Sequence, residues 1–184
     1  MSPQRREQLD RPLTHRDLDD TPEDGNLYEV IDGALHVTPF PDFAHQQAGA
    51  QLFGQLYVHV EAGGLGKVFF SGLKIVLDEP TGVGPDIVYI SHGRMDRMRE
   101  DGYHGAPDLM VEVLSSRPER DRVVKAAKYA RAGVPHYWIV DPGARILRAY
   151  RLEAGHFALA GDFTGPFEPE LLPGLTLDLT RLWV

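Results

Sequence analysis

Two carboxylates in this chain occupy positions where a charge is costly. Glu112 lies in the apolar segment LMVEVL at residues 109–114, and Asp86 follows Pro85 at the start of the segment DIVYI. A carboxylate removed from water needs a cationic partner or a bound cation. If these segments are neighbouring strands, the carboxylates meet near one end of a sheet, where they repel each other or bind a divalent cation such as Mg²⁺. The alternatives are a structural ion pair for Glu112 and a turn for Asp86.

A lysine and a further acidic residue are candidates for the same cluster. Lys125 follows in a predicted helix, on the same face as Arg122 and Tyr129 by their spacing. An ammonium group near two metal-bound carboxylates could orient or deprotonate a water, or stabilise charge that develops on a phosphate. Glu29 lies in another apolar segment near the N-terminus and could join the cluster. A solvated lysine and a structural glutamate are the alternatives.

Several kinds of site lack support in the sequence. The 184 residues include no Cys, which excludes disulfides, thiolate zinc sites, iron–sulfur clusters and a cysteine nucleophile. The eight His show no HxH or HExxH spacing, and neither a phosphate-binding glycine loop nor a GxSxG motif is present. His45 and His136 are the two histidines best placed for a role, with a structural role as the alternative for each.

Charge limits the ways in which this chain could bind nucleic acid. Its 19 Lys and Arg against 27 Asp and Glu give a formal charge of −8, which argues against non-specific coating of nucleic acid. A local basic patch at residues 117–131 could hold phosphates, although a solvated helix face explains it equally well. Its members are Arg117, Arg120, Arg122, Lys125, Lys128 and Arg131. We take Arg122 and Lys128 as candidate substrate-binding residues.

Length and hydropathy predict one domain over residues 1–184 and no membrane partner. No apolar run approaches the roughly 20 residues that a membrane span needs, and the basic N-terminus has no apolar segment behind it. We therefore expect a cytoplasmic protein. Residues 1–26 are polar and are predicted to contain a short helix that starts at Thr14, with Asp17 completing a capping box.

Periodicity predicts an α/β fold with a mixed sheet. Residues 28–37 are typical of a β-hairpin that turns at Asp32-Gly33, and residues 145–152 and 157–159 of a second hairpin. Strands are expected at residues 67–77, 86–90, 109–114 and 136–140. A helix is predicted at residues 43–62, with Ala48, Leu52, Leu56 and Val60 facing the core, and another after Pro118, with Val123, Ala127 and Ala130 as its inner face. The second helix links two strands as a βαβ unit, which implies that they are parallel.

Four blocks in fixed order carry a resemblance to a known family. The blocks are YEVIDGALHV, PDIVYIS, GAPDLMVEVLS and DRVVKAAKYARAGVPHYWIVDP. They resemble the Uma-type family of putative restriction endonucleases, in the PD-(D/E)xK nuclease superfamily, over about residues 13–152. The resemblance implies a restriction-endonuclease-like mixed β-sheet core flanked by helices, with an N-terminal β-hairpin extension.

The resemblance also implies roles for individual residues. In the superfamily the two acidic residues of the motif bind Mg²⁺ and the lysine assists the attacking water; Asp86 and Glu112 match the acidic positions. Leu114 stands where the motif lysine would be. The family pattern DRxxKxxxY places that lysine at Lys125, with Lys128 as the fallback. Glu29 matches the acidic position of the first block and is implied as a further metal ligand.

The sequence therefore predicts a Mg²⁺-dependent nuclease, with Mn²⁺ as a possible substitute, that hydrolyses phosphodiester bonds in nucleic acid, with DNA as the expected substrate. A non-catalytic binding or assembly module with the same fold and a hydrolase of small phosphate esters are the alternatives. Contact through one small basic patch implies weak, salt-sensitive binding to DNA, or a homo-oligomer that enlarges the surface. The apolar stretch at residues 171–184 is either core or a dimer contact.

Overall fold

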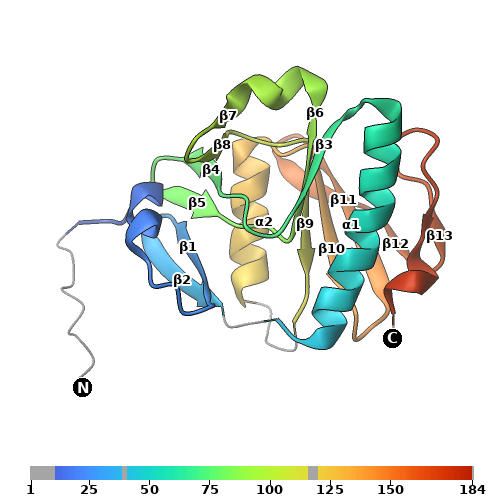
Figure 1. Cartoon of the computed structure of the whole chain (residues 1–184), viewed down its shortest axis with the longest axis horizontal. Coiled ribbons are helices and arrows are strands. Elements are labelled where there is room, and N and C mark those ends of the chain that lie inside the picture. The colour runs from blue at the N-terminus through green and yellow to red at the C-terminus, as the bar shows by residue number, and fades with distance from the viewer. Residues whose placement is uncertain (1–10, 39–40, 116–119, 184) are drawn as a thin grey trace.

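Two six-stranded sheets and two α-helices dominate the part of the chain that the computed structural model describes, which is residues 11–38, 41–115 and 120–183 (Figure 1). The side chains of residues 120–123 are outside that description. Helices flank mixed β-sheets, as the sequence predicted. In these described ranges no helix is long and apolar enough to cross a membrane.

The N-terminal sheet has the order β2-β1-β5-β4-β8-β7. Its strands are β1 Leu27–Ile31, β2 Ala34–Thr38, β4 Ile75–Asp78, β5 Thr81–Val83, β7 Met98–Arg99 and β8 Gly102–His104. Strands β1 and β2 form the predicted hairpin, and its turn residues Asp32 and Gly33 both have positive φ. The predicted short helix is confirmed as the 3₁₀ helix His15–Asp20, which starts with a capping box between Thr14 and Asp17.

The central sheet has the order β12-β11-β10-β9-β6-β3. Its strands are β3 Gly66–Phe70, β6 Ile87–Ser91, β9 Leu109–Val113, β10 His136–Asp141, β11 Ile146–Glu153 and β12 His156–Phe163. Strands β9 and β10 are parallel, as the βαβ prediction requires, whereas β11 and β12 form the predicted second hairpin. Strand β6 runs antiparallel to β9, so that the segments of Asp86 and Glu112 are neighbours.

Helix α1, Phe43–Gly63, covers one face of the central sheet. Its inner face consists of the predicted residues, which are fully buried: Ala48, Leu52, Leu56 and Val60. The helix starts at the N-cap Asp42, whose side chain accepts from the backbone N–H of His45, and ends at Gly64 in the left-handed conformation.

The C-terminal residues complete the core on this face. The short strands β13 Pro166–Phe167 and β14 Leu177–Asp178 lead to the 3₁₀ helix Leu179–Leu182. Five leucines from this stretch are buried with α1 and the central sheet: Leu172, Leu175, Leu177, Leu179 and Leu182. Full burial of each contributes on the order of 1.5–3 kcal/mol, so the stretch is part of the core rather than a separate apolar surface.

Helix α2, Arg120–Ala132, contributes to a second core between the central and N-terminal sheets. The predicted inner face is confirmed at Ala130, which is buried, and is wrong at Ala127, which is exposed; the side chain of Val123 is outside the described residues. Lys125, Lys128 and Tyr129 are buried as well. The reason is that carboxylates from both sheets face this helix: Lys125 pairs with Glu29 and Glu112, and Lys128 pairs with Asp32.

The single strand predicted at residues 67–77 is also wrong, because this segment forms β3 and β4 in different sheets. Ser71 and Gly72 between them have φ of 45° and 88°, a conformation incompatible with an extended strand. The break carries the chain from the central sheet to the N-terminal sheet. The backbone N–H of Ser71 also donates to the backbone carbonyl of Asp86 at 2.8 Å, which anchors the segment before β6.

Candidate functional site

Asp86 and Glu112 lie side by side at one end of β6 and β9. Ile87 is paired with Val111, and one further step in this antiparallel register sets Asp86 opposite Glu112. The backbone N–H of Val113 donates to Asp86 Oδ2 at 2.8 Å, which joins the Asp86 carboxylate to β9. Sequence reasoning predicted that these carboxylates would converge, and the sheet order confirms the neighbouring strands on which that prediction depended.

Lys125 bridges two carboxylates that come from different sheets. Its Nζ lies 2.8 Å from Glu29 Oε2 on β1, and 3.3 Å and 3.4 Å from the two oxygens of Glu112 on β9. The Glu29 side chain is 1% exposed, and its other oxygen accepts from the backbone N–H of Gly84 at 3.0 Å. The structure therefore brings Glu29, Glu112 and Lys125 together, with both Glu29 oxygens engaged.

Tyr129 fixes the orientation of Glu112 from the same helix as Lys125. Its buried hydroxyl donates to Glu112 Oε1 at 2.6 Å. Burial and the neighbouring carboxylates raise the pKa of Tyr129 well above its usual value, so the hydroxyl keeps its proton and remains a donor. One turn of α2 thus supplies two donors to a single carboxylate.

Burial and neighbouring charges set the protonation of the two central groups. Burial raises the pKa of Glu112 to about 7, and Asp86 and Glu29 add to the rise, whereas Lys125 and Tyr129 oppose it. Burial alone would lower the pKa of Lys125, but Glu112 and Glu29 raise it above its ordinary value. Lys125 is therefore a permanent cation near neutral pH, and Glu112 is poised between its two forms.

His45 reaches the same cluster from the first turn of α1. Its Nε2 lies 3.3 Å from Asp86 Oδ2. Burial alone would lower the pKa of His45, but the hydrogen bond and charge of Asp86 raise it overall. Sequence reasoning named His45 only as a candidate. The sequence feature that points to a role for His45 is its position just after the N-cap of α1. The inner face of this helix packs on the strand that carries Glu112.

The donor set fits a hard divalent cation held by two carboxylates. Mg²⁺ usually keeps several waters and takes one or two carboxylate ligands from the protein, as Asp86 and Glu112 would supply. No group of three or more His, Cys, Asp or Glu able to hold a metal ion is found in the described part of the chain. A direct metal contact by Glu29 stays a prediction, and its observed partners are Lys125 and the Gly84 backbone.

Comparison with known proteins identifies the family of the chain and supports its fold. The family model Uma2, described as "putative restriction endonuclease", matches residues 15–180. The chain belongs to the Uma2 family. A solved structure of a putative nuclease of DUF820 from Anabaena variabilis has the same fold, with a TM-score of 0.76. It is 22% identical to this chain, and the match covers 93% of this chain and 97% of the other. No curated protein matches.

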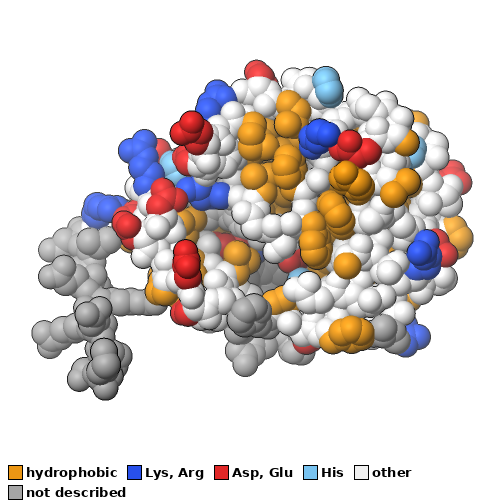
Figure 2. Space-filling view, in the orientation of Figure 1, with side chains coloured by type: hydrophobic (Ala, Val, Ile, Leu, Met, Phe, Trp, Pro, Cys, Tyr) orange, Lys and Arg blue, Asp and Glu red, His pale blue; other side chains and the backbone are white. Residues whose placement is uncertain are grey.

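The basic residues of this Uma2 family member are less available to phosphate than the sequence suggested. Lys128 is buried and pairs with Asp32 and Asp78 of the N-terminal sheet, so it fastens α2 to that sheet. Lys125 is engaged by Glu29 and Glu112. Of the other four basic residues in the patch, Arg131 is exposed, and Arg117, Arg120 and Arg122 have side chains outside the described part. Figure 2 shows Lys and Arg scattered among acidic side chains on the visible face.

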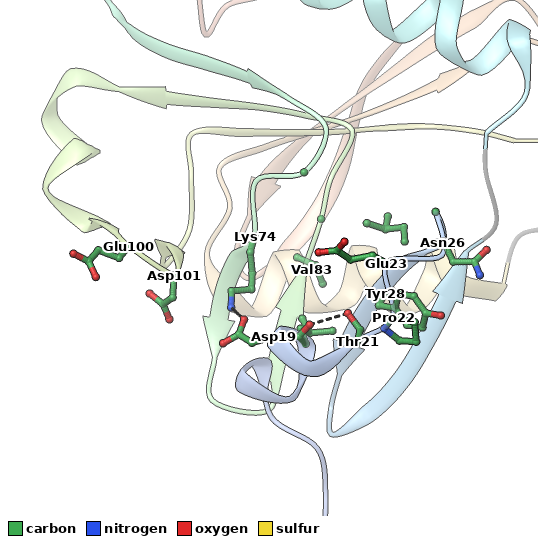
Figure 3. Close-up of a pocket in the computed structure, with 15 residues that line it drawn as sticks. Asp19, Thr21, Pro22, Glu23, Asn26, Tyr28, Lys74, Val83, Glu100 and Asp101 are labelled. Carbon is green, nitrogen blue, oxygen red and sulfur yellow. Dashed lines mark hydrogen bonds and ion pairs between the residues drawn. The ribbon is translucent and has the colours of Figure 1, made fainter. Parts of the chain in front are cut away.

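A pocket of about 740 Å³ opens on the N-terminal sheet, and its lining includes Tyr28, the residue before Glu29 on β1. Gly84, whose N–H binds Glu29, is part of its lining. Its charged side chains are mainly carboxylates, namely Asp19, Glu23, Glu100 and Asp101, and its lysine, Lys74, is paired with Asp19 at 2.7 Å (Figure 3). This charge repels phosphates, so a nucleic-acid backbone is not expected to follow this pocket.

Proposed function

We propose that the chain is a Mg²⁺-dependent nuclease that hydrolyses phosphodiester bonds in nucleic acid, with DNA as the substrate. The observation that carries this proposal is the cluster in which Asp86 faces Glu112 while Lys125 contacts Glu112 and Glu29. Family membership and fold support the nuclease class. The metal, its ligands and the nucleic acid are the parts that this proposal adds.

Asp86 and Glu112 would hold the Mg²⁺, or Mn²⁺ in its place. When bound, such an ion polarises a phosphate and lowers the pKa of a bound water. Glu112 must be ionised to act as a ligand, and its pKa of about 7 means that ion binding competes with a proton near neutral pH. Tyr129 and Lys125 fix the direction of its carboxylate in either case.

Lys125 would act as a fixed positive charge rather than as a proton acceptor. Its raised pKa keeps it protonated, since two buried carboxylates favour the ammonium form. A protonated lysine can donate a hydrogen bond that orients a water, and its charge offsets negative charge that develops on a phosphate. Glu29 would contribute by holding Lys125 in place, because its oxygens contact Lys125 and the Gly84 backbone.

Contact with nucleic acid would be limited in area and sensitive to salt. Two of the lysines in the predicted basic patch are occupied by internal carboxylates, and the whole chain carries a charge of −8. Arg122 remains the candidate for contact with the phosphate backbone. Because a protein that neutralises few phosphates binds weakly at physiological salt, a homo-oligomer or a partner would be needed for tight binding.

A non-catalytic binding or assembly module is the second candidate function. The observation that favours it is the same ion-pair network: Lys125 already neutralises much of the charge of Glu29 and Glu112 without a metal. In that case the buried pair would be structural, and tight binding of a divalent cation at Asp86 and Glu112 would not be expected.

A cleavage assay separates these functions. Wild type, Glu112→Gln and Lys125→Met are incubated with supercoiled plasmid or single-stranded DNA in Mg²⁺, Mn²⁺ or EDTA, with Glu61→Gln as the control. Glu61 is paired with Lys67 at the surface, away from this cluster. We expect cation-dependent cutting by wild type and Glu61→Gln, and loss of cutting in both site variants. Cutting that survives Glu112→Gln contradicts the site, whereas wild type that binds no cation and cuts neither substrate favours the binding module.

A further inference from the structure

The carboxylate of Asp86 is held by two donors from separate elements. The backbone N–H of Val113 on β9 donates to Oδ2 at 2.8 Å, and Nε2 of His45 on α1 lies 3.3 Å from the same oxygen. Among the described residues, no hydrogen bond or ion pair engages Oδ1. The two donors therefore fix the rotation of the side chain, and within the described part of the chain Oδ1 is open to another ligand.

His45 can fill this role in either of its protonation states. An ionised carboxylate only accepts hydrogen bonds, so Nε2 must carry a hydrogen for the contact to be favourable. That hydrogen is present in the charged ring and in one tautomer of the neutral ring. The contact thus depends on the position of the ring, which the cap at Asp42 and the first turn of α1 determine.

The surroundings of His45 argue that the ring is there for Asp86. Its side chain is 12% exposed, and its second nitrogen, Nδ1, is buried without a partner among the described atoms. A buried polar atom without a hydrogen bond costs about 1–3 kcal/mol. An apolar residue at this position would avoid that cost, which indicates that the Nε2 contact offers a compensating benefit.

The two central carboxylates differ in how they are supported. Glu112 has two side-chain donors from α2, Lys125 and Tyr129. Asp86 has one side-chain donor from α1, His45, and one backbone donor. Both helices therefore contribute to the same pair of adjacent strands, α1 through His45 in its first turn and α2 through Lys125 and Tyr129.

We propose that His45 is a positioning residue for Asp86: it holds Oδ2 so that Oδ1 stays available to a divalent cation. This inference rests on the proposed metal-dependent function. It assigns to His45 no direct contact with the cation. Support groups of this kind typically change metal affinity about 10- to 100-fold when they are removed.

The test measures Mn²⁺ affinity by electron paramagnetic resonance and, separately, DNA cleavage. His45→Leu removes the donor and keeps the bulk, while His45→Gln keeps an N–H close to the place of Nε2. His59→Leu is the matched control, because His59 lies on the same helix, about 21 Å further along its axis at 1.5 Å per residue. We expect weaker Mn²⁺ binding, by about 10- to 100-fold, for His45→Leu, and affinities close to wild type for the other two.

The outcomes separate this inference from the proposed function. Wild-type affinity in His45→Leu, or an equal loss in His45→Gln, overturns the positioning role, and wild-type cleavage of DNA would still support the nuclease. Mn²⁺ binding that weakens as expected in a protein that cuts no DNA supports the positioning role and contradicts the nuclease. A wild type that binds no Mn²⁺ overturns both. Far-UV circular dichroism checks that each variant is folded.

Discussion

The substitution Glu112→Gln should make this protein more stable while it removes the proposed activity. Glutamine keeps the shape of the side chain and an acceptor for the hydroxyl of Tyr129, which now donates to Glu112 at 2.6 Å. What it removes is the negative charge. Because the charge is buried beside Asp86 and Glu29, the ionised form of Glu112 is unfavourable in the folded state even with Lys125 next to it.

The size of the gain follows from the pKa of Glu112. A rise from the ordinary value of 4.5 to about 7 corresponds to about 3 kcal/mol, at 1.36 kcal/mol per pKa unit. The side chain is 14% exposed, so solvent screens little of this effect. The folded state binds the proton more tightly than the unfolded state; stability is therefore lost as the pH rises from 4.5 to 7, and the full cost applies above pH 7.

Urea denaturation followed by circular dichroism, in EDTA, measures this difference. We expect Glu112→Gln to exceed wild type by about 3 kcal/mol in free energy of unfolding at pH 8, and by about 1 kcal/mol or less at pH 5. Glu61→Gln serves as the control, because its carboxylate forms a surface pair with Lys67 and should have little effect at either pH. A destabilised Glu112→Gln at pH 8, or the same difference at both pH values, would refute the reasoning.

Two further pairs of variants test the framework of the site. Lys125→Met should lower the free energy of unfolding by about 3–5 kcal/mol, because it leaves Glu29 buried without its cation. The carboxylates that pair with Lys128 are exposed, so Lys128→Met should lower the free energy of unfolding by about 1 kcal/mol or less and should retain cleavage. Urea titrations and the plasmid assay check both, and equal losses would contradict the assignment. Gly66→Ala should disrupt the β3–β6 pairing, since a Cβ would meet the Ile90 carbonyl, whereas Gly54→Ala in α1 has open space and should gain about 0.5–1 kcal/mol. Thermal unfolding compares these two, and a tolerated Gly66→Ala would be inconsistent with the pairing.

Local patterns predicted the elements whose packing is apolar. The period of four in α1 predicted its inner face, and Asp32-Gly33 predicted the first hairpin, because apolar burial and turn geometry are encoded by neighbours in sequence. The same logic placed Glu112 in a strand, whereas the pairing of that strand with the segment of Asp86 follows only from the sheet order. Charged residues in apolar strands were the signal for the site, since such residues require partners from elsewhere.

Local patterns failed where a charge is buried by a distant partner. The inner face of α2 was assigned to Val123, Ala127 and Ala130. Lys125 and Lys128 are buried as well, because Glu29 and Asp32 of the first hairpin pair with them. Nothing within α2 itself distinguishes these lysines from solvated ones. The choice between Lys125 and Lys128 as the neighbour of Glu112 likewise needed the arrangement of the two sheets around the helix.

The charge balance of the cluster links its stability to its proposed chemistry. Three carboxylates, Asp86, Glu112 and Glu29, act on one ammonium group, Lys125. If all three are ionised and His45 is neutral, the excess is two negative charges, which a divalent cation would neutralise. In EDTA a proton on Glu112 reduces that excess, which its pKa of about 7 makes possible near neutral pH. We therefore expect Mg²⁺ to displace this proton and to stabilise wild type. Much of the difference in free energy of unfolding between Glu112→Gln and wild type in EDTA should then disappear.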